Sequence, residues 1–299
     1  MRSTGLSLAT IVAAASLTAC PPSPNGGGSK TTAPATSGSA PTPSTSTAAS
    51  AAPSATSSAE PTPEPYQGPS GTLRGTIKIT GDEPPQTTHQ YPKECAPAVA
   101  TYGKLFRVGQ EGQLADALVA VTHYDGYVPP KEEAVKVTIK DCAYSTRTVA
   151  LTTGQYIEVK NLDPLTSYIP HLDGARSAAT MVAVPRGKAV NVRSRGPGRY
   201  WLRDQMGRPF MFADVFHFKY GTTDVTALDG KYEISGIPVG KVQVSVMLPA
   251  ANLLTLNKET EIKEGDNTLD LTLDFDAEKD VPKKNPGAKD GAKEAPEKK

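Results

Sequence analysis

Few residues in this chain could bind a metal or act as a nucleophile. The sequence has three cysteines and four histidines. It lacks the short motifs that place a serine beside a base, bind zinc on a helix or hold phosphate in a glycine-rich loop. Glu132 and Glu133 are adjacent, so on a strand they would face opposite sides and could not work as a pair. The sequence therefore predicts that the protein is not an enzyme.

The first twenty residues have the layout of an export signal that ends in a cysteine. Arg2 is followed by an apolar run over residues 6–15, and small residues then lead to Cys20. The last four, LTAC, resemble the bacterial lipobox, which implies that Cys20 becomes the lipidated first residue of the mature chain. An ordinary signal peptide with a chance cysteine is the alternative. No later apolar run reaches the roughly 18 residues of a membrane span, so we expect the protein to be held to a membrane by acyl chains.

Export also fixes the expected use of the other two cysteines. Outside the cytoplasm oxidation is the default, so Cys95 and Cys142 are predicted to form one disulfide, which would stabilise the fold by about 4 kcal/mol in the chain-entropy model. A cysteine metal site is the alternative, but KECAP and KDCAY contain no second Cys or His. The expected location is the cell envelope. Pro-Pro follows Cys20, so the acidic residue that would keep a lipoprotein out of the outer membrane is missing. The outer membrane is therefore expected if the host is diderm.

The chain has polar flanks around a central β-rich part. Residues 21–70 are Pro, Ser, Thr, Ala and Gly with almost nothing to bury, and are expected to form a disordered linker. Residues 277–299 are rich in Lys, Glu, Pro and Ala and are expected to form a charged, disordered tail. Glycosylation of the linker and contact of the tail with the cell wall or lipid headgroups stay open. The net charge of +1 with mixed signs argues against nucleic acid as a partner.

Between the flanks, apolar residues recur at every second position in short runs that Gly, Pro, Asn and Asp interrupt. About twelve such runs could be strands. Residues 91–106 are the one candidate for a helical turn or two, limited by Pro92 and Pro97. This pattern predicts an all-β chain of antiparallel sandwiches. We place a larger module at residues 71–221 and a smaller one at residues 222–276.

Two stretches of the larger module resemble a known family. They are VTIKDCAYSTRTVALTTGQYIEVKNLDPLTSYIPH, residues 137–171, and PRGKAVNVRSRGPGRYWLRDQMGRPFMFADVFHF, residues 185–218. Together they are similar to the plastocyanin-like, or cupredoxin, domain of bacterial exported proteins. TALDGKYEISGIPVGKVQVSVMLP, residues 226–249, is similar to the carboxypeptidase regulatory-like, transthyretin-like module that often follows it. The resemblance implies a cupredoxin-like Greek-key β-sandwich and a smaller transthyretin-like β-sandwich module.

The family resemblance also implies a type 1 copper site. Such a site has two histidines, a cysteine and a weak axial methionine, the first histidine shortly after an N-x-D-P turn and the others in a C-x-x-H-x-x-M loop. The turn is present at residues 161–164, but the ligand positions hold Ser167, Leu202, Gln205 and Arg208. None of these side chains offers a thiolate, an imidazole or a thioether. The sequence therefore predicts a degenerate, copper-free site and no cofactor.

Four other residues could form a rearranged copper site. They are His171, Met206, Met211 and His217, a His/Met set that could hold Cu(I) without a thiolate. Methionine between phenylalanines is more often part of a core, and a lone histidine is more often structural. This set is therefore the alternative to a copper-free domain.

A separate candidate patch lies on the strand RYWLRD. Tyr200 and Leu202 are expected to face the core, which puts Trp201 on the other face with Arg199 and Arg203. An exposed Trp between two arginines could stack on a glycan or contact an acidic partner. It could equally pack against the second module.

These residues favour a membrane-anchored envelope lipoprotein that acts as a non-catalytic binding or structural module. Its partner is an unidentified envelope protein or polysaccharide. The first alternative is a copper-binding or electron-transfer protein that uses the rearranged His/Met site. The second alternative is a carbohydrate-binding module centred on Trp201.

Overall fold

A computed structural model describes residues 64–174 and 181–282. The predicted signal peptide, Cys20 and most of the predicted linker and tail lie outside these described residues. Inside them the chain forms sixteen strands and three short helices, so the predicted all-β class is confirmed. None of the helices in the described ranges is long and apolar enough to cross a bilayer.

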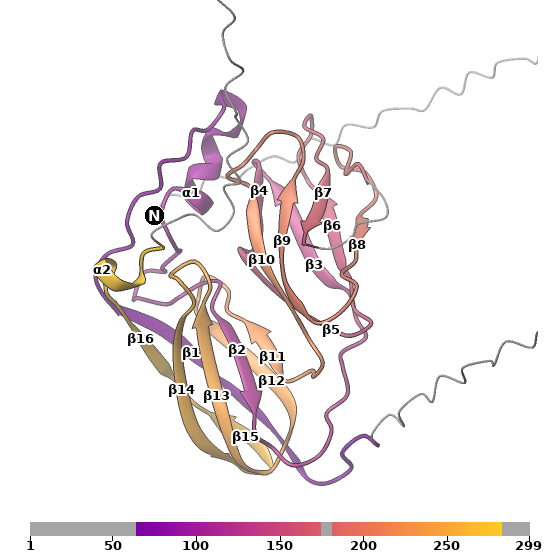
Figure 1. Ribbon diagram of the computed structural model, residues 1–299, viewed down its shortest axis with the longest axis vertical. Helices are drawn as coiled ribbons and strands as arrows, with labels where there is room; N and C mark the ends of the chain where they lie inside the picture. Colours follow the sequence, from indigo (N-terminus) through magenta and orange to yellow (C-terminus); the bar gives the residue numbers. More distant parts are fainter. Residues whose placement is uncertain (1–63, 175–180, 283–299) are drawn as a thin grey trace, which may run out of the picture. The chain divides into compact units, whose positions relative to one another are not determined.

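The first sandwich packs two four-stranded sheets around one core (Figure 1). Their strand orders are β5-β10-β9-β7 and β4-β3-β6-β8. The strands are β3 (Val135–Lys140), β4 (Ala143–Tyr144), β5 (Thr148–Thr152), β6 (Ile157–Asn161), β7 (Pro170–Asp173), β8 (Val190–Val192), β9 (Gly198–Asp204) and β10 (Phe212–Phe218). The expectation of antiparallel sheets is wrong in part, because β3 pairs parallel with β6 and β5 pairs parallel with β10.

The second sandwich has its own core. One sheet has the order β12-β1-β15, with β16 also paired to β1, and the other has the order β11-β2-β13-β14. The strands are β1 (Ser70–Gly81), β2 (Leu118–Thr122), β11 (Thr223–Val225), β12 (Lys231–Pro238), β13 (Gly240–Leu248), β14 (Leu254–Ile262), β15 (Gly265–Thr268) and β16 (Leu271–Phe275). Apolar residues at every second position of β13 are buried, as the alternation predicts.

Strand pairing divides the chain differently from the sequence boundary at residue 221. β1 and β2 precede the first sandwich in the sequence, yet they pair with strands that follow it. Arg74 of β1, for example, bonds to Glu233 of β12, 159 positions later. Alternation of apolar residues marks a strand but does not identify its partner. The sequence-based boundary therefore assigned each strand to the same module as its neighbours in the sequence. By pairing, β1 and β2 belong with residues 222–276.

The folded part is longer at both ends than the sequence indicated. Tyr66, inside the predicted linker, donates its backbone N–H to the carbonyl oxygen of Tyr127 at 2.8 Å. At the other end, α2 (Ala277–Asp280) occupies the first residues of the predicted disordered tail. The Asp276 side chain caps this helix by accepting the backbone N–H groups of Glu278 and Lys279. The polar composition of this segment therefore predicted disorder, although Asp276 supplies a local helix-capping signal.

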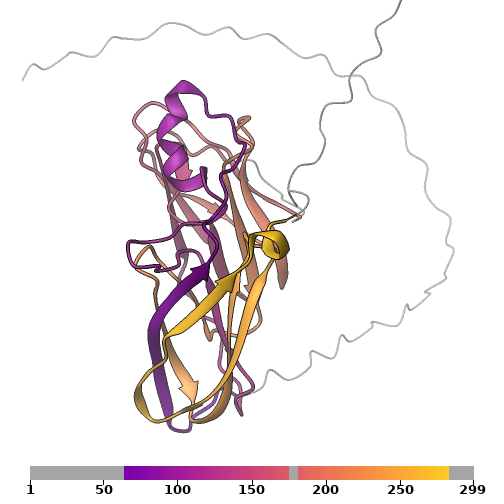
Figure 2. The same ribbon diagram turned by 90° about the vertical axis from the view of Figure 1, so that its left-hand side faces the viewer.

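The predicted helical segment consists of a 3₁₀ helix, η1 (Lys93–Ala98), followed by α1 (Val99–Tyr102). Figure 2 shows it as the purple coil at one end of the ribbon. The predicted disulfide is confirmed: Cys95 of η1 and Cys142 are joined, with an S–S distance of 2.02 Å. Cys142 belongs to the turn between β3 and β4, so the bond ties the helical segment to the first sandwich.

Candidate functional site

The four degenerate ligand positions lie on two loops and one strand at one end of the first sandwich. Ser167 is between β6 and β7, Leu202 is in β9, and Gln205 and Arg208 follow β9. Leu202 is fully buried in the apolar core. An alkyl group, a hydroxyl, an amide and a guanidinium do not fit copper, because the metal needs soft sulfur and imidazole nitrogen donors. The residues present therefore disagree with the cofactor that the family resemblance implies.

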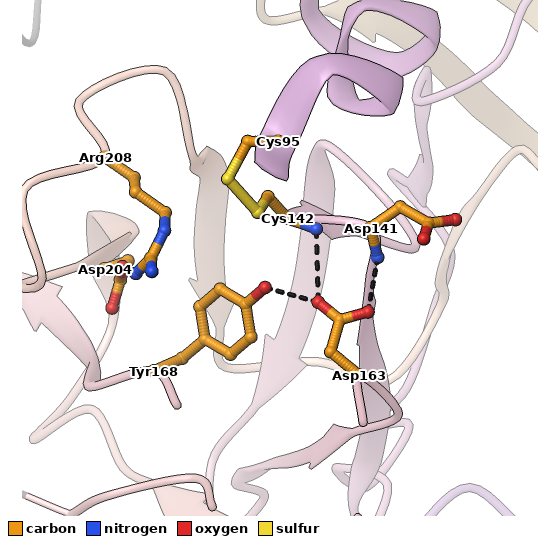
Figure 3. The surroundings of a disulfide bond; sticks show 7 residues. All are labelled: Cys95, Asp141, Cys142, Asp163, Tyr168, Asp204 and Arg208. Carbon is orange, nitrogen blue, oxygen red and sulfur yellow. Dashed lines mark hydrogen bonds and ion pairs between the residues drawn. A yellow bond between two sulfur atoms is a disulfide. The ribbon is translucent and has the colours of Figure 1, made fainter. Parts of the chain in front are cut away.

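A buried carboxylate, Asp163, organises this end of the sandwich (Figure 3). It accepts the backbone N–H of Asp141 at 2.7 Å and that of Cys142 at 3.3 Å, and also the hydroxyl of Tyr168. Burial raises the pKa of Tyr168, and the hydrogen bond to Asp163 raises it further. The phenol therefore stays protonated and acts as a donor at neutral pH.

The two N–H groups that Asp163 binds belong to a strained turn. Asp141 and Cys142 both have positive φ, at 53° and 58°, the sign pattern of a two-residue type I′ hairpin turn. Glycine or asparagine usually occupies such positions, and a side chain there is strained. The carboxylate and the disulfide at Cys142 together hold the turn in this conformation.

Arg208, at the position of the axial ligand, has a structural partner. Its Nη1 lies 2.7 Å from Oδ2 of Asp204, a carboxylate whose side chain is fully buried. The other oxygen of Asp204 accepts the backbone N–H of Ile169 at 2.8 Å. The guanidinium carbon also lies 4.8 Å from the ring centroid of Tyr168, a cation-π distance. Arg208 therefore closes over the phenol that binds Asp163.

The N-x-D-P turn keeps its shape through its asparagine. Asn161 donates from Nδ2 to the carbonyl oxygens of Thr166 and Ala183, both at 2.8 Å. Its Oδ1 accepts the backbone N–H of Asp163 at 2.9 Å. These bonds are made in the absence of any ligand side chain, so the turn can persist without a metal.

The rearranged His/Met set is not brought together. His171 of β7 is in register, across β9, with Phe212 of β10. His217 is five residues beyond Phe212 along β10, which places it about 17 Å from Phe212 at the usual strand rise. Met211 is fully buried in the core, whereas Met206 is 49% exposed in the loop after β9. Within residues 64–174 and 181–282, no group of three or more His, Cys, Asp or Glu side chains is arranged to hold a metal ion.

The two faces of β9 are arranged as the alternation predicts. Leu202 is in the core and Tyr200 packs against it. Trp201 therefore lies on the opposite face with Arg199 and Arg203 and is partly buried. The Arg199 guanidinium is 5.5 Å from the Trp201 ring.

Both arginines beside Trp201 have carboxylate partners. Arg199 donates from Nε and Nη2 to Asp214 at 3.0 and 2.6 Å. Burial raises the pKa of Asp214, although the charge of Arg199 opposes the shift. Arg203 lies 2.8 Å from Asp173, whose other oxygen is 2.9 Å from Nε2 of His171. The charges that could attract an acidic partner are therefore compensated inside the protein.

A second buried carboxylate, Asp116, was not anticipated. The backbone of Asp116 has a positive φ of 63°. Its carboxylate forms a bidentate interaction with Arg107, in which Nε donates to Oδ2 at 2.7 Å and Nη2 donates to Oδ1 at 2.6 Å. Oδ1 also accepts the hydroxyl of Thr146 at 3.0 Å and the backbone N–H of Arg147 at 2.8 Å. This cluster joins the segment before β2 to the connection between β4 and β5.

Sequence analysis missed Tyr168, Asp204 and Asp116 because none of them belongs to a motif, and it gave Asp163 no role beyond its place in the N-x-D-P turn. Asp163 was treated as part of a turn, and its bond to the β3–β4 turn crosses 22 positions. The one available signal was the presence of an aspartate and a tyrosine, Asp163 and Tyr168, five positions apart in one loop. That signal is too common to be specific.

Comparisons with known proteins give structural neighbours for part of the chain. No family model matches, and no curated protein matches. A copper-containing nitrite reductase from Thermus scotoductus SA-01 matches with 13% identity and a TM-score of 0.25, over 33% of this chain and 25% of that chain. Amicyanin from Paracoccus versutus matches with 17% identity and a TM-score of 0.25, over 33% of this chain and 97% of that chain.

The matched part of this chain therefore corresponds to about a quarter of the reductase and to nearly all of amicyanin. The chain is all-β with cupredoxin neighbours over a third of its length.

Proposed function

We propose that this chain is an exported lipoprotein, held to a membrane through Cys20, whose folded part is a non-catalytic binding or structural module. The observation that carries the proposal is the chemistry at the four ligand positions. Ser167, Leu202, Gln205 and Arg208 present no soft donor, and Arg208 would place a positive charge beside the metal.

The packing of the same end supports this proposal. The bonds of Asp163 hold the β3–β4 turn to Tyr168, and Arg208 closes over that phenol. The loops are therefore held together by hydrogen bonds from uncharged donors to the Asp163 carboxylate and by one buried ion pair. Such a hydrogen-bonded end is suited to presenting side chains to a partner.

Lipidation is tested on the full chain expressed in a bacterial host. Mass spectrometry of the mature protein should find Cys20 as the first residue, carrying acyl chains. The variant Cys20→Ser should lose the acyl mass and serves as the control. A mature chain that begins at another residue, or that carries an unmodified Cys20, would contradict the anchor.

The copper-free part is tested on residues 60–299, one compact unit that contains both cores and the disulfide. Equilibrium dialysis against Cu(I) and against Cu(II), followed by metal analysis, should find no stoichiometric copper. Stoichiometric, tight copper that His171→Ala abolishes would replace the proposal with the rearranged His/Met site.

A further inference from the structure

The end of the first sandwich that carries the degenerate positions also exposes many apolar side chains. The described residues have ten exposed large apolar side chains, and six of them are in three loops at this end. We call these six the apolar tip: Leu162, Leu165, Met181, Val182, Val184 and Met206. Leu165 is 89% exposed, which is far beyond what packing requires. A gathered set of such side chains marks an interaction surface.

The three loops form a single surface because hydrogen bonds join them. Tyr168 and Ala183 exchange backbone hydrogen bonds at 3.2 and 2.8 Å, which joins the first loop to the second. The side chain of Asn161 also donates to the carbonyl of Ala183. The backbone N–H of Gln205 donates to the carbonyl of Ile169 at 3.1 Å, which joins the first loop to the third.

Among the described residues of these three loops, the exposed charges are positive. Arg186 and Lys188 are exposed beside Val184, whereas Asp163 and Asp204 are buried and hydrogen-bonded. The neighbouring β3–β4 turn adds an exposed Asp141 beside an exposed lysine, so its charges cancel. The tip therefore combines protruding apolar groups with exposed cations.

We propose that the apolar tip inserts into the headgroup region of an anionic lipid bilayer. Apolar side chains beside Lys and Arg are the composition of surfaces that bind at the lipid interface. The tip consists of Leu, Val and Met, whereas energetically important protein contacts favour Trp, Tyr and Arg and are poor in Leu and Val. The inference rests on the proposed function, since a chain anchored at Cys20 is kept close to a bilayer.

Vesicle binding by residues 60–299, which carry no acyl anchor, tests the inference. Wild-type protein should sediment with vesicles of phosphatidylcholine and phosphatidylglycerol, and more weakly with phosphatidylcholine alone. The double variant Leu165→Asp, Met206→Asp should bind the anionic vesicles at least about tenfold more weakly, because both apolar groups are replaced by repelled charges.

Leu228→Asp is the matched control, because Leu228 is 55% exposed but lies outside the tip. It makes one of the two changes, Leu to Asp, at a different exposed position, keeps the lysine-rich tail, and should bind like the wild type. Circular dichroism should show that all the proteins are folded. Equal binding by the double variant and the wild type would overturn the inference, as would an equal loss in Leu228→Asp.

Failure of the inference is distinguishable from failure of the proposed function. If the wild type binds no vesicles while Cys20 is acylated in cells, the tip proposal alone is wrong. If it binds no vesicles and instead captures a protein through Leu165, the tip is a protein-docking surface and the lipid proposal is overturned. If the wild type binds vesicles through the tip but Cys20 is not acylated, the lipid anchor alone is wrong.

Discussion

Two buried carboxylates stabilise this protein by different means. Asp163 accepts two backbone N–H groups and a phenol, and none of these donors carries a charge. Asp116 is bonded by both prongs of the Arg107 guanidinium. The first lies beside a disulfide, whereas the second depends on an ion pair.

The difference shows how the end of a sandwich can be ordered by hydrogen bonds to a single carboxylate. A metal ion joins loops by binding a side chain from each, and here one carboxylate does so with hydrogen bonds. Asp163 joins the β3–β4 turn to the loop after β6. Asp116 shows the alternative, in which a buried charge must be matched by an opposite charge.

The disulfide beside Asp163 is expected to give the largest effect. Replacing Cys95 and Cys142 by alanine together should lower the free energy of unfolding by up to about 4 kcal/mol, because the unfolded chain regains the freedom of a long loop. Guanidinium unfolding monitored by circular dichroism measures the change, and the reduced wild-type protein is the control. A loss below about 1 kcal/mol would mean that Asp163 holds the turn without the covalent bond.

Breaking the ion pair at Asp116 should come next. Asp116→Asn should lower the free energy of unfolding by about 3 kcal/mol, because it leaves the Arg107 charge partly buried without its partner. Urea unfolding measures the change. The double variant Arg107→Met, Asp116→Asn should recover part of the loss, since the unpaired charge is gone. Additive losses would show that the two side chains are not coupled.

Removing the phenol hydroxyl should have a smaller effect. Tyr168→Phe should lower the free energy of unfolding by about 1.5 kcal/mol, the usual contribution of a bond to a charged acceptor. Tyr66→Phe removes a hydroxyl that bonds the Pro69 carbonyl near the surface at 3.2 Å and is the matched control. If both variants lose equally little, the Tyr168 bond does not support the loop.

The smallest expected effect is a pH dependence that arises from a buried histidine. Burial lowers the pKa of His217 from 6.5, and the ring bonds to Ser194 at 2.7 Å. The unfolded chain therefore binds the proton first, so the free energy of unfolding falls as the pH drops through about 6.5. His217→Asn should lose part of this fall, measured by urea unfolding between about pH 7 and about pH 5. An unchanged pH profile in His217→Asn would contradict this role, and His123→Asn, at an exposed position, is the control.

Sequence patterns were sufficient for the local features. Alternation predicted that Leu202 faces the core and Trp201 does not, and compartment chemistry predicted the bond between Cys95 and Cys142. These features depend on neighbouring residues or on the number of cysteines.

Contacts between distant residues could not be predicted in the same way. β1 pairs with β12, β15 and β16, and no residue of β1 encodes that choice by itself. Asp163 binds the turn at Asp141 because the fold brings the two loops together. The sequence shows directly that Ser167 and Gln205 are not copper ligands. It does not show which groups hold these loops instead, because those groups come from distant parts of the chain.

The central claim is that Asp163, and no metal, supports the end of the first sandwich. The most direct test is the thermal unfolding midpoint of residues 60–299, measured with a chelator and with stoichiometric Cu(I) or Cu(II), for the wild type and for Asp163→Ala. The account predicts that copper leaves the wild-type midpoint unchanged and that Asp163→Ala lowers it. A wild-type midpoint that rises with copper, together with an unchanged midpoint for Asp163→Ala, would contradict the account, because a ligand raises the midpoint only when it binds the folded state.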